Sequence, residues 1–193
     1  MFIVRIGITT AVLCAGAPAG DRRNLDTPGT DTHFVMPAYA NLGEWEARKE
    51  SLRAQILSAA GLLPLPEKTP LNPQVFGKME RQGYTIEKVL LETYPGFWLG
   101  GNLYRPRGRQ GPFPGVVSPH GHWSYGRLEN THLGSLPARG INLARQGFVV
   151  FLYDMVGYND TTQLPHARIG GDREDLWSIN LLGLQLWNSI RAT

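Results

Sequence analysis

Two stretches decide the fold class: PFPGVVSPHGHW at residues 112–123 and LPARGINLARQGFVVFLY at residues 136–153. The first runs apolar and stops in a polar loop, which indicates a buried strand. In the second, residues 136–146 have a helical pattern closed by Gly147, and FVVFLY at 148–153 is a continuous apolar run, typical of a strand covered on both faces. A strand, a helix and a second strand in this order predict a parallel crossover, and hence an α/β fold.

The flanking segments extend this unit. Residues 83–106, GYTIEKVLLETYPGFWLGGNLYRP, predict two strands joined by a Tyr-Pro-Gly turn, an antiparallel hairpin. Residues 41–61 predict an amphipathic helix, and residues 172–192 predict a helix that is apolar nearly all round and therefore buried on two sides. Because a sheet that stops there keeps an open hydrophobic edge, we expect an incomplete domain.

Composition supports a globular chain without a nucleic-acid footprint. Of 193 residues, 42% are hydrophobic and 18% charged, and 23 glycines with 14 prolines indicate short elements between sharp turns. The net charge of +3 is scattered, with no basic run longer than Arg22-Arg23. We therefore expect no nucleic-acid partner.

The amino terminus has the pattern of a secretory signal peptide. Residues 1–19 place one early cation, Arg5, before an apolar run and end in small residues, and the run is too short for a permanent membrane anchor. We expect a signal at 1–19, a flexible leader at 20–40, a partial α/β domain at 41–193, and a secreted or periplasmic protein. Cys14, the only cysteine, would leave with the signal. The alternative is an imperfect start or a buried first strand.

The candidate site is the loop His120-Gly121-His122-Trp123, at the end of the first buried strand. Ligands bind at this end of the strands in open α/β sheets. Glycine lets the backbone turn so that successive N–H groups point one way, and such donors can stabilise an oxyanion. In this interpretation His120 orients the loop and does not abstract protons.

Two other interpretations of the loop stay open. The two histidines could hold a metal, although two ligands do not make a site, and the further ligands would have to come from His132, His166, Asp154 or Asp160. They could also simply bond to loop carbonyls without a function. We predict no metal and no cofactor.

Further candidates follow the second buried strand. Tyr125, Asp154, Tyr158 and Asn159 are candidate pocket residues, because they lie in loops at or beyond the ends of the two strands. Asp and Asn also close turns locally, so a structural loop role is favoured for Asp154, Asn159 and Asp160.

No triad residue can be assigned within the chain. An esterase of this architecture needs a Gly-x-Ser-x-Gly elbow, and the sequence contains none. Ser118 lies in an apolar run, and Ser124 and Ser135 lie in loops, so none is nominated as the nucleophile.

Taken together, the motifs resemble the first half of a secreted α/β-hydrolase of the acetyl xylan esterase-like kind. The motifs are GNLYRP at 101–106, FPGVVSPHGHW at 113–123, LARQGFVVFLYDMVGYND at 143–160 and GLQLWNSIRA at 183–192. The resemblance implies a serine carboxylic-ester hydrolase whose loop supplies one oxyanion donor, the backbone N–H of His122 or Trp123. It places the serine, the acid and the triad histidine beyond Thr193, so the chain alone would be inactive.

The resemblance also implies a small-molecule or carbohydrate ester as substrate, such as an ester of a plant polysaccharide. A non-catalytic carbohydrate-binding or scaffold protein is the alternative, in which the aromatic loops contact sugar. A His-x-His metalloenzyme is a third hypothesis, and it requires metal bound by His120 or His122.

Overall fold

The computed structural model describes residues 29–33, 35–167 and 169–193. The expected signal peptide and the start of the leader lie outside the described residues. Residues 42–193 form one compact unit, and the chain up to Asn41 forms a separate one. Within the latter, the backbone N–H of Thr32 donates to the Gly29 carbonyl at 3.1 Å, which closes a turn.

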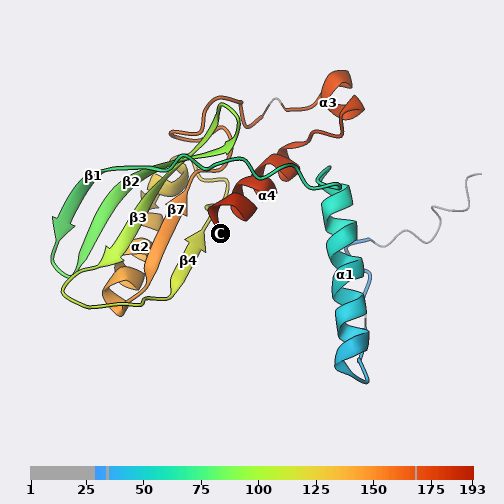
Figure 1. The fold of residues 1–193 in the computed structure, drawn as a ribbon, viewed down its shortest axis with the longest axis horizontal. Coiled ribbons are helices and arrows are strands. Elements are labelled where there is room, and N and C mark those ends of the chain that lie inside the picture. Colours follow the sequence, from blue (N-terminus) through green and yellow to red (C-terminus); the bar gives the residue numbers. More distant parts are fainter. Residues whose placement is uncertain (1–28, 34, 168) are drawn as a thin grey trace, which may run out of the picture. The chain divides into compact units, whose positions relative to one another are not determined.

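A five-stranded mixed sheet forms the larger unit, with the strand order β1-β2-β3-β7-β4 (Figure 1). The strands are β1 (Gln74–Arg81), β2 (Tyr84–Tyr94), β3 (Phe97–Pro106), β4 (Gly115–Ser118) and β7 (Val149–Tyr153). The predicted hairpin is β2 and β3. Strands β4 and β7 are parallel, and the other neighbours are antiparallel.

The predicted parallel crossover is confirmed, and local signals explain it. Helix α2 (Leu136–Gln146) connects β4 to β7, and the Ser135 hydroxyl caps it by accepting from the Ala138 N–H at 3.1 Å. Gly147 ends the helix with a φ of 107°, in the left-handed region that favours glycine. These signals lie within a few residues of the helix ends, so the sequence carries them visibly.

The sheet is covered on both faces at β7. Val150 and Leu152 pack with Tyr104 and Leu136 in one cluster, and Phe151 packs with Leu99 in another. Because successive side chains of a strand point to opposite faces, the two clusters lie on opposite sides of the sheet. Helix α2 covers the first face (Figure 1).

The predicted continuous helix over 172–192 is wrong. The structure has a short α3 (Asp172–Leu176) and a separate α4 (Leu181–Ala192). Asn180 is extended, and its side-chain oxygen accepts from the Gly183 N–H at 2.8 Å, so it starts α4 afresh. Trp177, expected to be buried, is 73% exposed in the break, whereas Trp187 of α4 is fully buried.

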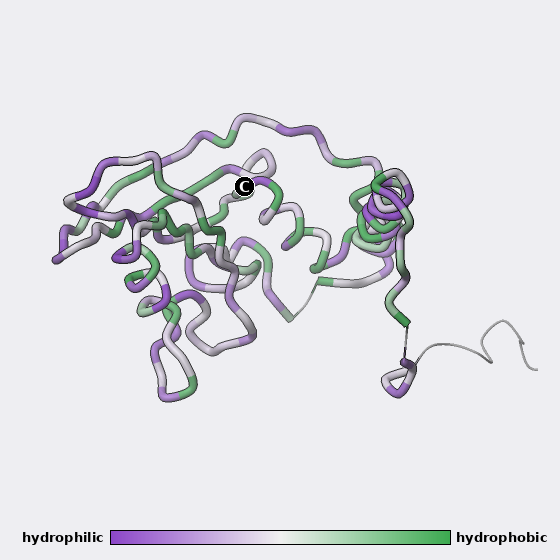
Figure 2. Tube along the Cα trace, turned by 90° about the horizontal axis from the view of Figure 1, so that it is seen from below, coloured by the Kyte–Doolittle hydropathy of each residue, from purple (hydrophilic) through white to green (hydrophobic). Residues whose placement is uncertain are grey.

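Helix α1 (Leu42–Ala59) matches the predicted amphipathic helix in position. Only Leu57 of it is buried, and it packs with Ala60, Leu62 and Trp187. Hydrophobic and hydrophilic residues follow one another around this helix (Figure 2). In the part of the chain that the structure describes, no helix combines the length and hydropathy needed to span a bilayer.

Two small elements complete the unit: a 3-10 turn η2 (Gly126–Leu128) and a two-stranded ribbon of β5 (Asn130–Thr131) and β6 (Gly134–Ser135). Both lie between β4 and α2 in the chain. They carry the segment that follows the candidate loop.

Candidate functional site

The candidate loop and the β7 exit lie at the same edge of the sheet. Strands β4 and β7 are parallel neighbours, with Ser118 opposite Leu152 at their carboxyl ends. Residues 119–123 leave β4, and residues 154–161 leave β7. This is the edge at which open α/β sheets bind ligands.

His120 fastens the two loops together. Its side chain is 6% exposed, and its Nε2 accepts from the Met155 N–H at 3.0 Å. The proton of the neutral ring is therefore on Nδ1, which donates to the Gly121 carbonyl at 2.7 Å. Burial lowers the pKa of His120, which keeps the imidazole neutral.

Two glycines let the backbone approach His120 and the loop closely. A Cβ on Gly121 would lie 2.8 Å from Nε1 of Trp123. Gly126 has a φ of 54°, and a Cβ there would lie 3.0 Å from Nε2 of His120. The loop conformation therefore requires glycine at both places.

Of the two proposed oxyanion donors, one is already used. The Trp123 N–H donates to the Gly121 carbonyl at 2.8 Å. Among the residues that the structure describes, none accepts a hydrogen bond from the backbone N–H of His122. Of the two expected donors, the His122 N–H is thus the one without an acceptor among the described residues.

The exposed side of the loop faces a pocket of about 410 Å³. Its lining residues are His122, Trp123, Ser124, Glu129 and Leu133. Glu129 is 5% exposed, and its carboxylate accepts from the Tyr125 N–H at 3.1 Å. No sequence signal pointed to Glu129, because this residue stands outside any motif or periodic element.

The two histidines of the loop do not converge. His120 turns into the interior, whereas the Nε2 of His122 lies 2.7 Å from the Nε2 of His166. The Nδ1 of His166 donates to the Val156 carbonyl at 2.8 Å, so its Nε2 accepts the His122 proton. Within the described ranges, no three His, Cys, Asp or Glu side chains group as metal ligands.

A buried ion pair supports the site from beneath. Arg127 and Asp154 are 5% and 0% exposed, and their side chains form a salt bridge. Arg127 also pairs with Asp160 and donates from Nε to the Asn102 side chain of β3 at 2.8 Å. Three segments, β3, η2 and the β7 exit, therefore share one guanidinium.

Asp154 holds its own loop as well. Its carboxylate accepts from the Asn159 side chain at 2.8 Å and from the Asp160 N–H at 2.9 Å. Burial raises the pKa of Asp154, while Arg127 and these two donors act in the opposite direction. Asp154 is thus an interior ion-pair partner that holds its loop, in keeping with the favoured structural role, and it does not line the His122 pocket.

The other candidate pocket residues lie apart from the His122 pocket. Tyr125 is 63% exposed, and the ring of Tyr158 meets the ring of His120 edge-on at 4.8 Å. Asn159 lines a separate pocket of about 530 Å³ that also includes Lys88 and Asp160. The structure therefore does not bring the four together around one cavity.

Comparison with solved structures gives the fold. A protein described as Methylesterase BT1017 matches with a TM-score of 0.53 and 29% identity, over 64% of this chain and 27% of that one. A putative acetyl xylan esterase from Bacteroides fragilis matches with a TM-score of 0.55 and 14% identity, over 78% of this chain and 42% of that one. The chain has the fold of an acetyl xylan esterase-like α/β-hydrolase.

This confirms the resemblance that the sequence motifs indicated. The chain spans less than half the length of either protein. A scan against models of known families and a search of curated proteins found no match. The assignment of the fold is thus based on the strand order, on the parallel crossover and on the similarity to the solved structures.

Removing the buried cation tests the role of the ion pair. Arg127→Met leaves Asp154 interior and unpaired, so we expect the free energy of unfolding to fall by about 3 kcal/mol. The control is Arg105→Met, since Arg105 is 48% exposed and pairs with Glu87 at the surface. Its loss is expected to stay below about 1 kcal/mol in the same urea titration. Equal effects of the two variants would contradict the role given to Arg127.

The neutral state of His120 predicts a pH dependence of stability. Because its pKa is lower in the folded chain than in the unfolded one, the unfolded state binds the proton more tightly. Stability is therefore full above the ordinary histidine pKa of about 6.5 and falls as the pH decreases below it. Urea unfolding from about pH 7.5 to pH 5 is expected to show a shallower pH slope in His120→Gln. An unchanged slope would show that His120 is not the group responsible.

Proposed function

We propose that this chain carries the oxyanion-stabilising loop of a serine ester hydrolase acting on acyl or acetyl esters. One observation carries the proposal: the His122 N–H has no acceptor among the described residues and belongs to a loop that lines a pocket. That loop leaves a parallel strand at the edge where hydrolase-like sheets bind ligands. Two of the similar structures are a methylesterase and a putative acetyl xylan esterase, and this supports an ester as the substrate class.

The proposed step is stabilisation of charge. When a nucleophile attacks the ester carbonyl, the carbonyl oxygen becomes an oxyanion, and the His122 N–H donates to it. A preorganised donor of this kind is typically worth about 3 kcal/mol in the transition state. His120 contributes by positioning: with both ring nitrogens bonded within the protein, it holds the backbone of the loop in place.

The nucleophile is proposed to come from outside these 193 residues. Ser118 is 7% exposed at the end of β4, and Ser135 caps α2. Ser124 lines the His122 pocket, but it follows a loop and not a strand-turn-helix elbow. A serine, an acid and a histidine supplied elsewhere would complete the acyl-transfer machinery.

The proposed substrate is a small-molecule or carbohydrate ester, such as an acetylated plant polysaccharide, met outside the cytoplasm. The exported location rests on the signal-like sequence of residues 1–19. The proposed substrate class is supported by the fold, by the loop and by the esterases among the similar structures.

Turnover of an aryl acetate tests the assignment of the nucleophile. The purified 193-residue chain is expected to show no serine-dependent hydrolysis of the aryl acetate. The product of the gene read on past residue 193 is expected to hydrolyse it, and a serine-reactive phosphonate is expected to abolish that turnover. Robust phosphonate-sensitive turnover by the short chain would refute the proposed division of residues. No such turnover by the longer product would refute the esterase itself.

Two substitutions at residue 122 separate its backbone from its side chain. In the longer product, His122→Pro removes the proposed donor and is expected to lower kcat by about 100- to 1,000-fold. His122→Ala keeps the N–H and removes only the imidazole, so its kcat is expected to fall far less. Both variants are checked by thermal unfolding. Equal losses in two folded variants would show that the N–H is not the donor.

A further inference from the structure

A third pocket lies between α1 and α4, and it shares no lining residue with the two pockets described above. It has a volume of about 510 Å³, within the range of small-molecule sites. Ten residues line it: Trp45, Lys49, Leu52, Arg53, Ile56, Leu57, Leu65, Lys68, Leu186 and Ile190. None of them belongs to the loop or the ion-pair cluster described above, so this pocket plays no part in the proposed ester hydrolysis.

The helix spacing gives the pocket one apolar wall with cations set into it. Trp45, Lys49, Leu52 and Ile56 recur at intervals of three and four residues, which places them on one face of α1. Arg53 follows Lys49 by four residues on the same face. The face is therefore apolar along its length and positively charged within it.

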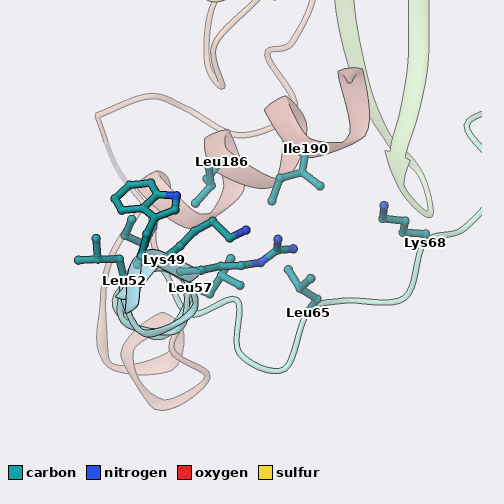
Figure 3. Close-up of a pocket in the computed structure, with 10 residues that line it drawn as sticks. Lys49, Leu52, Leu57, Leu65, Lys68, Leu186 and Ile190 are labelled. Carbon is teal, nitrogen blue, oxygen red and sulfur yellow. The ribbon is translucent and has the colours of Figure 1, made fainter. Parts of the chain in front are cut away.

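The opposite wall is apolar. Leu186 and Ile190 of α4 face α1 across the pocket, and Leu65 comes from the segment after α1 (Figure 3). Lys68 follows on that segment and adds a third cation (Figure 3). The lining thus consists of seven apolar residues and three cations.

The apolar wall stays open to solvent. Trp45 is 44% exposed, Ile56 57% and Leu65 38%. A contiguous apolar surface of this kind marks a binding site more often than a scattered exposed side chain does.

The positive charge of the lining indicates an anionic ligand. The lining contains no carboxylate, and Lys49 alone of the three cations has a salt bridge among the described residues, to Glu46. A ligand that buries an alkyl chain and presents an anion satisfies both parts of the lining. A neutral chain leaves the cations unused, and a cationic one meets like charges.

We propose that this pocket binds a free medium-chain fatty acid, with its alkyl chain between α1 and α4 and its carboxylate at Lys49, Arg53 and Lys68. One alkyl chain suits a pocket of small-molecule size, and the negative charge of one carboxylate is opposite in sign to the cations of the lining. This site is separate from the ester site, so the two proposals stand or fall independently.

Calorimetric titration of the full chain with laurate tests the proposal. We expect saturable binding of laurate and at least about tenfold weaker binding of dodecyltrimethylammonium, which has the same chain length and the opposite charge. Equal affinity for the two ligands would overturn the assignment. So would the absence of saturable laurate binding up to about 1 mM, or binding to anionic phospholipid vesicles without binding of laurate.

Substitutions on one helix locate the site. Arg53→Gln is expected to weaken laurate binding about two- to fivefold, because a cation at a partly exposed site contributes up to about 1 kcal/mol. Arg48→Gln, on the same helix but outside the lining, is the matched control and is expected to leave the affinity unchanged. Thermal unfolding checks both variants, and Lys68→Gln, outside the helices, replaces Arg53→Gln if that variant unfolds. No change in the lining variant, or the same change in the control, would overturn the location.

Discussion

The guanidinium of Arg127 is the point on which the candidate site depends. It lies almost fully buried and reaches Asp154 after β7, Asp160 farther along the same loop, and Asn102 on β3. A charge in the interior is tolerated only with such partners, since its desolvation is otherwise too costly. The arrangement fixes where η2 lies relative to the sheet, and η2 begins three residues after Trp123.

His120 also connects two segments, and it lies in the loop that lines the pocket. It is bonded on one side to the loop that it belongs to and on the other to the first residues after β7. The imidazole thus joins the loop after β4 to the loop after β7, and the ion pair independently joins η2 to that same loop after β7. Among the described residues none accepts a hydrogen bond from the backbone N–H of His122, which belongs to the loop that lines the pocket.

The sequence predicted best where the deciding signals are local. Helix α2 begins after Ser135 and ends at Gly147 as expected, because its cap and its left-handed terminus can be seen in neighbouring residues. The helix over 172–192 was wrong because apolar periodicity continues through a break that Asn180 sets by capping a new helix. Strand β1 was missed because all of its residues are exposed, so it carries no burial pattern.

At the site, the sequence indicated the loop and the positioning role of His120, but not the pairs that complete it. The contact of His122 with His166 joins residues 44 positions apart, and that of Arg127 with Asp154 joins residues 27 apart. No motif encodes these separations, because each pair meets only once the parallel strands have brought their ends together.

The contact between His122 and His166 has a consequence for the rim of the pocket. In a hydrogen bond between two neutral imidazoles, one ring is the donor and the other is the acceptor. The Val156 carbonyl accepts from the Nδ1 of His166, so the Nε2 of His166 is the acceptor and His122 is the donor. The hydrogen bond between the two rings therefore runs in one direction, from the Nε2 of His122 to the Nε2 of His166. A backbone carbonyl in the loop after β7 thus sets the tautomer of a side chain in the loop after β4, with His166 as the intermediary.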